Sequence, residues 1–226
     1  MQILLDTADV NKIKAVLPYF PIDGVTTNPS ILAKEAKDVK ETLTQIRELL
    51  GPDRMLFAQA TAHDSASIVA QAEALTREFG PNFYTKIPVT MQGLRAVSVC
   101  RERGLKTLVT AIFTPMQALL AAKAGADYVA PYVDRLDNIT SDGASVVGEI
   151  VELYRTYGYE TKVLAASFKN IQQVYNAASC GAHGVTVTAQ LCEKLIFHPY
   201  TDRSLEDFDI DWRCRFGDNG IETFFK

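Results

Sequence analysis

Residues 55–85, MLFAQATAHDSASIVAQAEALTREFGPNFYT, contain one complete unit of the pattern that decides the fold. A short apolar run at 55–58 is followed by Asp64 and Ser65, which can cap a helix. The apolar residues after this cap recur at helical spacing: Ile68, Ala72, Leu75 and Phe79. Gly80 then supplies the usual left-handed helix cap, and a second apolar run begins at Phe83. The stretch therefore predicts a strand, a helix and another strand.

The same unit repeats along the chain. Near-continuous apolar runs of this kind are typical of parallel strands that are covered on both faces. The predicted strands are 3–5, 24–26, 55–58, 83–85, 107–109, 128–130, 163–166 and 184–187. Most of the helices between them end at a glycine, and these glycines are about 26 residues apart, the length of one strand–helix unit. They are Gly51, Gly80, Gly104, Gly125, Gly158 and Gly181.

Eight strands that alternate with helices fit either an open doubly wound sheet or a closed (β/α)8 barrel. The eight units are similar and no GxGxxG motif follows the first strand, so we predict the (β/α)8 TIM barrel. From about Pro199 the sequence becomes acidic and then aromatic. We therefore predict one barrel domain over residues 1–226, with an extra C-terminal helix in a tail at 200–226.

Composition and charge exclude several classes of protein. Hydrophobic residues make up 47% of the 226 residues, and the formal net charge is −4. This mildly acidic chain lacks the basic field that binds nucleic acid, and no apolar run approaches the ~20 residues of a membrane span. The N-terminus reaches Asp6 without a basic region, unlike a signal peptide. The four cysteines contain no CxxC pair, which indicates reduced thiols in the cytoplasm.

Polar residues follow seven of the predicted strands. In a barrel these strand ends meet at the carboxyl-terminal rim, which is where the active sites of TIM-barrel enzymes lie. The residues are Asp6, Thr26 to Asn28, Gln59, Lys86, Thr110, Tyr132 with Asp134 and Arg135, and Ser167. A strand can simply end where a polar loop begins, but seven such ends in succession favour a functional site. The three histidines, His63, His183 and His198, are isolated, so we predict no metal site.

Lys86 lies in the apolar stretch 82–89, NFYTKIPV, with no acidic residue nearby in sequence. Burial in the mouth of a barrel lowers the pKa of a lysine and makes the neutral amine available. Such an amine can add to a ketone and form a Schiff base that acts as an electron sink. The alternative is a lysine whose ammonium reaches solvent. Asp6 is the expected proton shuttle for Lys86, unless it caps the helix that starts near Asp9.

A phosphate site is predicted at the end of the seventh strand. Ser167, Phe168 and Lys169 are expected to open the next helix, and a helix N-terminus with a nearby cation favours an anion. Arg135 can add a bidentate clamp on the phosphate. The alternative for Arg135 is a surface ion pair with Asp134 or Asp137.

Five segments together resemble the small transaldolase and fructose-6-phosphate aldolase family. They are 3–9 (ILLDTAD), 24–30 (GVTTNPS), 86–90 (KIPVT), 129–135 (VAPYVDR) and 162–169 (KVLAASFK). The match covers nearly the whole chain in order and spacing, and VTTNPS together with KIPVT is a specific combination. The resemblance implies a (β/α)8 barrel with a class I aldolase mechanism that uses neither a metal nor an organic cofactor.

The resemblance also assigns roles by position. It implies that Lys86 forms the Schiff base with a ketose or dihydroxyacetone unit, and that Asp6 handles protons at the substrate hydroxyl. Thr110 borders the lysine. The residues that would bind the substrate are Thr26 and Asn28 for the dihydroxyacetone hydroxyls, and Ser167 and Arg135 for the phosphate of the acceptor aldehyde.

The family further implies a ring-shaped homo-oligomer, a pentamer or a decamer, in which the C-terminal helix packs on a neighbouring subunit. The aromatic tail fits this expectation because large exposed apolar side chains need a cover. The aromatic residues concerned are Trp212, Phe216, Phe224 and Phe225.

Two branches of the family differ in the residues around the catalytic water. Transaldolases have Glu on the third strand and Phe in the sixth-strand motif, whereas fructose-6-phosphate aldolases have Gln and Tyr. Gln59 and Tyr132 resemble the aldolase branch, and the segments 134–138 (DRLDN) and 141–143 (SDG) look more like the transaldolase branch.

We therefore expect an aldolase that cleaves or forms fructose 6-phosphate from dihydroxyacetone and glyceraldehyde 3-phosphate. The first alternative is a transaldolase of the pentose phosphate pathway that transfers a dihydroxyacetone unit to erythrose 4-phosphate. A barrel of the deoxyribose-phosphate aldolase type is opposed by the VTTNPS segment. A sugar-phosphate-binding barrel without catalysis is opposed by the presence of both Lys86 and Asp6.

Overall fold

The computed structural model describes residues 1–225, so Lys226 at the end of the predicted tail lies outside the described residues. The chain divides into two compact units, Met1–Cys192 and Glu193–Lys226. Within residues 1–225, no helix is both long and apolar enough to cross a membrane.

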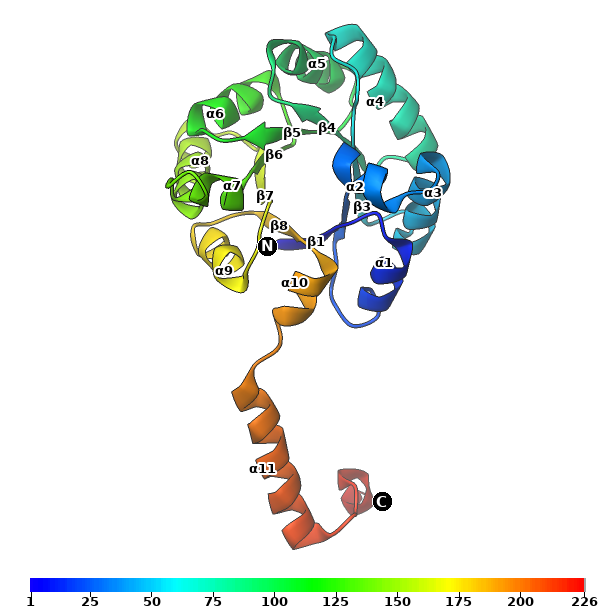
Figure 1. Cartoon of the computed structure of the whole chain (residues 1–226), viewed down its shortest axis with the longest axis vertical. Coiled ribbons are helices and arrows are strands. Elements are labelled where there is room, and N and C mark those ends of the chain that lie inside the picture. The colour runs from blue at the N-terminus through cyan, green and yellow to red at the C-terminus, as the bar shows by residue number, and fades with distance from the viewer. Residues whose placement is uncertain (226) are drawn as a thin grey trace. The chain divides into compact units, whose positions relative to one another are not determined.

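The first unit is a closed barrel of eight parallel strands, arranged around the ring in sequence order (Figure 1). The strands are β1 (Gln2–Asp6), β2 (Gly24–Thr26), β3 (Met55–Gln59), β4 (Phe83–Pro88), β5 (Thr107–Ile112), β6 (Tyr128–Pro131), β7 (Lys162–Ala165) and β8 (Gly184–Val187). Strand β8 pairs with β1, with Ile3 opposite Val185, and this pairing closes the ring. The predicted (β/α)8 barrel and all eight predicted strands are confirmed.

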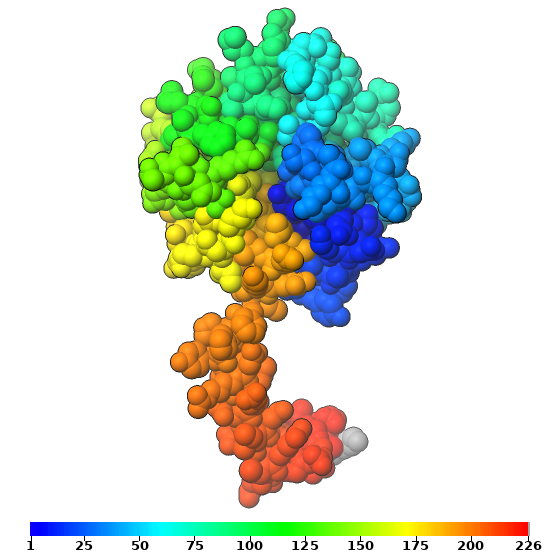
Figure 2. All heavy atoms as spheres, viewed as in Figure 1, coloured from blue at the N-terminus to red at the C-terminus, as the bar shows by residue number. Residues whose placement is uncertain are grey.

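Helices connect the strands and surround the barrel, and α4, α5, α6, α8 and α9 pack side by side in that order (Figures 1 and 2). The helices of this unit are α1 (Val10–Val16), α2 (Pro29–Glu35), α3 (Val39–Leu50), α4 (Ser65–Phe79), α5 (Met91–Glu102), α6 (Pro115–Ala124), α7 (Val133–Asp137), α8 (Gly143–Tyr157), α9 (Ile171–Ser179) and α10 (Ala189–Lys194), which reaches into the second unit.

Local sequence signals fix the limits of these helices. Asp64 caps α4, because its side chain accepts a hydrogen bond from the backbone N–H of Ser67 at 2.9 Å. Ile68 and Phe79 on this helix are buried against the barrel. All six glycines predicted to end helices have positive φ, for example 84° at Gly80, a conformation that side chains with a Cβ rarely adopt.

Large side chains fill the barrel interior. The rings of Phe57 and Tyr84 stack with their centroids 4.6 Å apart, and Tyr128 packs edge-on against both. Leu4, Leu108 and Leu164 belong to the same buried cluster. Full burial of one such side chain contributes about 1.5–3 kcal/mol to folding. The barrel is therefore a packed core with room for chemistry only at its ends.

The second unit contains helix α11 (Pro199–Phe216) and the short 3-10 helix η1 (Ile221–Phe225), so the predicted C-terminal helix is confirmed. Aromatic rings hold these two helices together: Trp212 lies 4.7 Å from Phe216, and Phe216 lies 5.2 Å from Phe224, between centroids. No residue of α11 is buried. Its exposed apolar side chains include Leu205, Phe208 and Ile210.

Candidate active site

A cavity of about 690 Å³ lies at the carboxyl-terminal ends of the barrel strands. Eight residues predicted for the site line it: Asp6, Asn28, Gln59, Lys86, Thr110, Tyr132, Arg135 and Ser167. The remaining predicted residue, Thr26, lies buried beside Asp6. The structure thus brings together side chains that follow or end seven successive strands, as a barrel does at its rim.

Strand pairing sets the positions of several of these residues. Gln59 is the register partner of Lys86, and Thr110 is the partner of Pro88. Lys86 and Thr110 each lie two residues before the end of their strand, because β4 and β5 continue three residues beyond the predicted ranges 83–85 and 107–109. Beyond Val109 the pairing of β5 with β6 shifts, and Ala111 has a φ of 60°. This irregularity lets the consecutive residues Thr110 and Ala111 both line the cavity, whereas regular strand residues alternate between faces.

Lys86 extends from the middle of the barrel into the floor of the cavity. Only 5% of its surface is exposed, and its Nζ donates a hydrogen bond to the backbone oxygen of Thr27 at 2.9 Å. Burial lowers the pKa of Lys86, and the negative charge of Asp6 opposes this by raising it. A lysine in this setting supplies a neutral amine more readily than one in water. The alternative of an ammonium that reaches solvent does not hold.

Asp6 lies at the end of β1 and faces the same floor. Thr26 donates a hydrogen bond from its hydroxyl to Asp6 Oδ1 at 2.7 Å, and the hydroxyls of Thr26 and Thr186 are 2.6 Å apart. Burial raises the pKa of Asp6, while Lys86 and the Thr26 hydroxyl lower it. Asp6 does not cap α1, because Asp9 has that role. A carboxyl group that holds its proton more strongly than usual can pass one to and from a substrate.

Three neutral polar side chains also line this cavity: Gln59, Thr110 and Tyr132. The hydroxyls of Tyr132 and Thr110 are 3.0 Å apart. Within residues 1–225, the side-chain amide of Gln59 has no hydrogen-bond partner, although it lines the cavity. An amide and a phenol can each both donate and accept hydrogen bonds. Gln59 and Tyr132 can therefore orient a water molecule or a substrate hydroxyl in either sense.

Arg135 is available for an anion. In the described part of the chain its guanidinium forms no ion pair, and it lies 5.0 Å from the centroid of the Tyr132 ring, a cation–π contact. Asp134 instead accepts hydrogen bonds from Asn138 and Gln173, at 3.0 and 3.2 Å. The Gln173 amide also reaches Asp137 at 2.7 Å. The alternative of an Arg135 ion pair with either aspartate is therefore wrong.

Ser167 lines the cavity together with Arg135, and its backbone oxygen accepts a hydrogen bond from the N–H of Asp134 at 2.8 Å. The local prediction around Ser167 needs a correction. Helix α9 begins at Ile171 and is capped by Asn170. Ser167 and Lys169 therefore belong to the turn before the helix and do not open it. Ser167 has a φ of 63°, an uncommon conformation for a residue with a side chain, and such outliers gather at functional sites.

Several residues of the cavity were not predicted from the sequence. They include Lys34 and Glu35 at the end of α2, and Thr186 and Thr188 at the end of β8. The two threonines are polar residues at the end of a predicted strand, the same pattern that indicated the site residues at the other seven strands. Lys34 and Glu35 carry no such signal, because only the folded path of α2 brings them to the cavity. No group of three His, Cys, Asp or Glu side chains suited to a metal ion occurs within residues 1–225.

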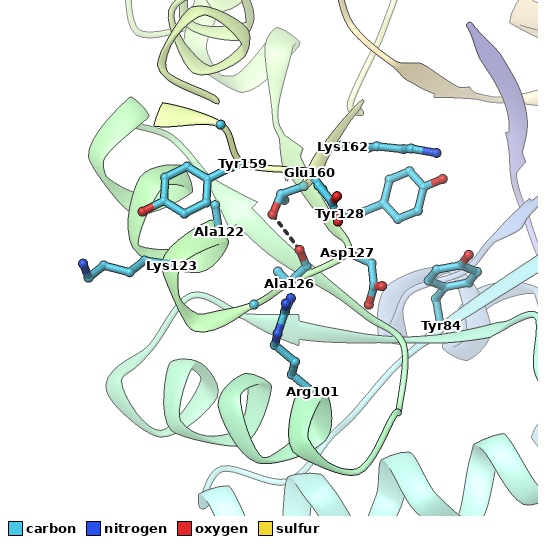
Figure 3. Close-up of a pocket in the computed structure, with 13 residues that line it drawn as sticks. Tyr84, Arg101, Ala122, Lys123, Ala126, Asp127, Tyr128, Tyr159, Glu160 and Lys162 are labelled. Carbon is cyan, nitrogen blue, oxygen red and sulfur yellow. Dashed lines mark hydrogen bonds between the residues drawn. The ribbon is translucent and has the colours of Figure 1, made fainter. Parts of the chain in front are cut away.

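A second hollow of about 510 Å³ lies at the amino-terminal ends of β6 and β7 (Figure 3). Tyr84, Asp127 and Tyr128 line it, and Arg101 extends into it from α5. Burial raises the pKa of Tyr84 to about 12, so this phenol keeps its proton at neutral pH. None of the residues predicted for the site lies here. The combination of a buried lysine and a nearby carboxyl group occurs only in the carboxyl-terminal cavity among the described residues.

Comparison with known proteins agrees with this geometry. A family model described as Transaldolase/Fructose-6-phosphate aldolase matches residues 3–219. A "Probable transaldolase" of Anaeromyxobacter sp. (strain Fw109-5) is 44% identical over 213 residues, which cover 94% of this chain and 97% of that protein. A "Probable transaldolase" of Alkaliphilus metalliredigens (strain QYMF) is 39% identical and covers 94% and 98%.

A solved structure with a similar fold is a cube-shaped, highly porous protein cage designed by fusing symmetric oligomeric domains. The TM-score is 0.61 at 12% sequence identity, and the match covers 95% of this chain and 77% of that one. At this low identity the likeness concerns the barrel fold alone.

Proposed function

The chain belongs to the transaldolase/fructose-6-phosphate aldolase family, and we propose that it is the aldolase type, which cleaves fructose 6-phosphate to dihydroxyacetone and glyceraldehyde 3-phosphate. The observation that carries this proposal is the burial of Lys86 at the floor of the cavity, beside the carboxyl group of Asp6. Burial lowers the pKa of Lys86, and the charge of Asp6 opposes this shift. A neutral amine next to a carboxyl group that can accept and return a proton is the pair that Schiff-base cleavage of a ketose needs.

The cleavage follows from these two groups. The Nζ of Lys86 adds to the ketone carbon of the sugar, and loss of water gives a protonated Schiff base. Asp6 takes the proton from the hydroxyl on the carbon to be released, and the bond between this carbon and its neighbour breaks. The electron pair of the broken bond moves into the Schiff base and gives an enamine. The aldehyde phosphate leaves, and the dihydroxyacetone unit stays on Lys86.

The far end of the cavity supports a phosphate on the departing aldehyde. The Arg135 guanidinium is not neutralised by Asp134 or Asp137, because Asn138 and Gln173 hold these carboxylates. Ser167 lines the same cavity, and its backbone oxygen accepts a hydrogen bond from the N–H of Asp134, the residue before Arg135. A guanidinium and a hydroxyl are suited to phosphate oxygens. We assign the hydroxyls of the dihydroxyacetone unit to Asn28, which lines the cavity, and to Thr26, which is buried beside Asp6.

Release of this unit needs a proton on the enamine carbon, which Asp6 can return, and then a water molecule that attacks the carbon bound to Lys86, whereas transfer needs an acceptor aldehyde in place of that water. Gln59 and Tyr132 can both donate to and accept from that water, whereas an ionised glutamate at position 59 would only accept. Together with Thr110, they favour hydrolysis of the Schiff base and release of dihydroxyacetone. The second candidate is transfer of the unit to erythrose 4-phosphate. The names of the relatives, "Probable transaldolase", and the segments 134–138 and 141–143 support that candidate.

The test compares the two outcomes in one preparation. With fructose 6-phosphate alone, we expect equal amounts of dihydroxyacetone and glyceraldehyde 3-phosphate, unaffected by EDTA. With erythrose 4-phosphate added, we measure both the dihydroxyacetone units transferred to it and the free dihydroxyacetone released. Efficient transfer without any free dihydroxyacetone would contradict the aldolase assignment. It would favour the transaldolase assignment, which the segments 134–138 and 141–143 support.

Tyr132→Phe is expected to lower the release of dihydroxyacetone by about tenfold, because it removes one of the groups that hold the water. Gln59→Glu combined with it should lower release further and raise the ratio of transfer to cleavage. Tyr159→Phe, which removes a phenol from the second hollow, is the matched control and should leave both rates unchanged. A transfer ratio that does not rise in the double variant would contradict the role given to the two residues.

We also propose that the chain forms a symmetric homo-oligomer through its second unit, a pentamer or decamer in the family pattern. The rings of Trp212, Phe216 and Phe224 cover one another in part, but Phe208 is 65% and Phe225 is 82% exposed. Apolar side chains with this much exposure indicate a surface that a neighbouring subunit covers.

Truncation before Ser204 is expected to shift the sedimentation coefficient from that of a large oligomer to a smaller species. Phe208→Glu should weaken the assembly in the same direction, because it places a charge in the proposed contact. Arg203→Glu introduces the same acid at an exposed polar position of α11 and should have the smaller effect. A monomeric intact chain at micromolar concentration would rule out the proposal.

A further inference from the structure

Glu35 at the end of α2 binds the turn that follows Asp6. Its Oε2 accepts hydrogen bonds from the hydroxyl of Thr7 at 2.9 Å and from the backbone N–H of Ala8 at 2.8 Å. The Thr7 hydroxyl in turn accepts from the backbone N–H of Asp9 at 3.1 Å. One carboxylate oxygen therefore fixes the first residues after the catalytic strand end.

The position of Glu35 brings a second negative charge to the cavity that contains Asp6. Glu35 lines this cavity, and only 20% of its side-chain surface is exposed. Lys12 lies 3.8 Å from Glu35 Oε1, but it is closer to Asp9, at 3.2 Å, and is itself half exposed. This shared and solvated cation neutralises Glu35 only in part.

The charged groups that act on Asp6 come from two elements. Lys86 on β4 lowers the pKa of Asp6, and Glu35 on α2 raises it, in addition to the larger effect of burial. The hydroxyls of Thr26 on β2 and Thr186 on β8 complete the surroundings without charge. The cations Lys34, Arg135 and Lys169 line the same cavity.

We propose that Glu35 is a positioning residue that acts through Asp6: its carboxylate holds the turn after β1, and its negative charge makes Asp6 the stronger base in bond cleavage. Hydrogen bonds from Thr7 and Ala8 explain why a carboxylate is stable there. They require only an acceptor, which a neutral amide also provides. The hydrogen bonds that hold the turn therefore do not need the negative charge of Glu35. That charge acts on Asp6 instead.

This inference rests on the proposed aldol cleavage, in which Asp6 must be ionised to take the proton of the substrate hydroxyl. A negative neighbour makes Asp6 hold its proton up to a higher pH, so cleavage falls earlier on acidification. Removing that charge makes Asp6 a weaker base that stays ionised at lower pH. The pH profiles of the protein with and without the charge should therefore cross.

Glu35→Gln tests this directly, because it keeps the acceptor oxygen and removes the charge. We measure kcat/KM for fructose 6-phosphate cleavage from pH 5 to pH 9 on the full-length protein. At pH 8 the variant is expected to be about twofold slower, and its ratio of activity at pH 5.5 to pH 8 is expected to rise about threefold, so that it is the faster protein at pH 5.5. Glu35→Ala removes charge and acceptor, and should lose about a further tenfold at every pH because the turn is no longer held.

Asp38→Asn is the matched control, since Asp38 is an exposed carboxylate three residues beyond Glu35 that caps α3 and does not act on Asp6. Its pH profile should superimpose on that of the unaltered protein. A Glu35→Gln profile that also superimposes would overturn the inference and leave Glu35 a purely structural residue. Absence of cleavage by the unaltered protein would instead contradict the proposed function, so the two failures are distinguishable.

Discussion

Lys86→Met is expected to abolish both activity and covalent capture of substrate. With fructose 6-phosphate and borohydride, the unaltered protein should gain the mass of one reduced sugar or dihydroxyacetone unit, on the peptide that contains Lys86. The variant should gain none, and kcat/KM should fall by at least about 10⁴-fold, the scale of loss when a covalent nucleophile is removed. Intact-mass and peptide mass spectrometry measure the adduct.

The fold should survive this change, because methionine fills a similar volume and the buried amine carries a desolvation cost that methionine avoids. Circular dichroism and thermal melting check this point. Lys162→Met removes a lysine from the amino-terminal end of β7 and should retain full activity and the full adduct. A sugar adduct that persists in Lys86→Met would show that another lysine is the nucleophile.

Asp6→Asn is expected to separate capture from turnover. The variant should lower cleavage by about 10²–10³-fold, the typical contribution of general acid–base catalysis. The Schiff base should still form, because the Asp6 charge raises the pKa of Lys86 and its removal leaves the amine more neutral, not less. Borohydride should therefore still reduce the Schiff base and leave a sugar unit on Lys86, although the variant hardly turns over.

Asp127→Asn is the control for this experiment, since its oxygen can keep the 2.7 Å hydrogen bond from the Thr107 N–H at the opposite end of the barrel. It should leave cleavage and capture unchanged. If Asp6→Asn lost the adduct and the activity to the same extent, Asp6 would serve to position Lys86 and not to move the proton in bond cleavage.

The fold was predictable because each signal acts over a short distance. The run at 83–85 is apolar on successive residues, which only a strand covered on both faces tolerates, and β4 is such a strand. Gly80 can adopt its φ of 84° without strain, so the helix ends where the sequence indicates. The strand limits were less predictable, as β4 continues through Pro88, because pairing with β5 and not composition decides where a strand stops.

The central pair of the site was predictable from topology alone. Asp6 and Lys86 are distant in sequence, but parallel strands of one barrel bring their carboxyl-terminal ends to one rim. Residues outside that rule were not predictable. Glu35 ends a helix, and no pattern in the sequence indicates that this helix returns to the turn after β1.

The sequence was also a poor guide to ion pairs. Asp134 and Arg135 are adjacent, which invites an ion pair, but neighbouring residues of a helix do not face each other. Asp134 therefore bonds to Asn138, one turn further on, and to Gln173 on another helix. The partner of a surface charge depends on residues that are close in space but distant in sequence, and the sequence alone does not show which these are.

The hydroxyl pair beneath Asp6 has a consequence for how this barrel can evolve. Thr26 has a single hydroxyl hydrogen and donates it to Asp6, so the 2.6 Å contact with Thr186 requires Thr186 to be the donor. If Thr186 were replaced by valine, Thr26 would lose its donor in a buried place. If Thr26 were replaced, Thr186 would lose its acceptor. Positions 26 and 186, which are 160 residues apart in the chain, should therefore behave as one heritable unit: a change at either position alone would be selected against, and descendants should retain both hydroxyls.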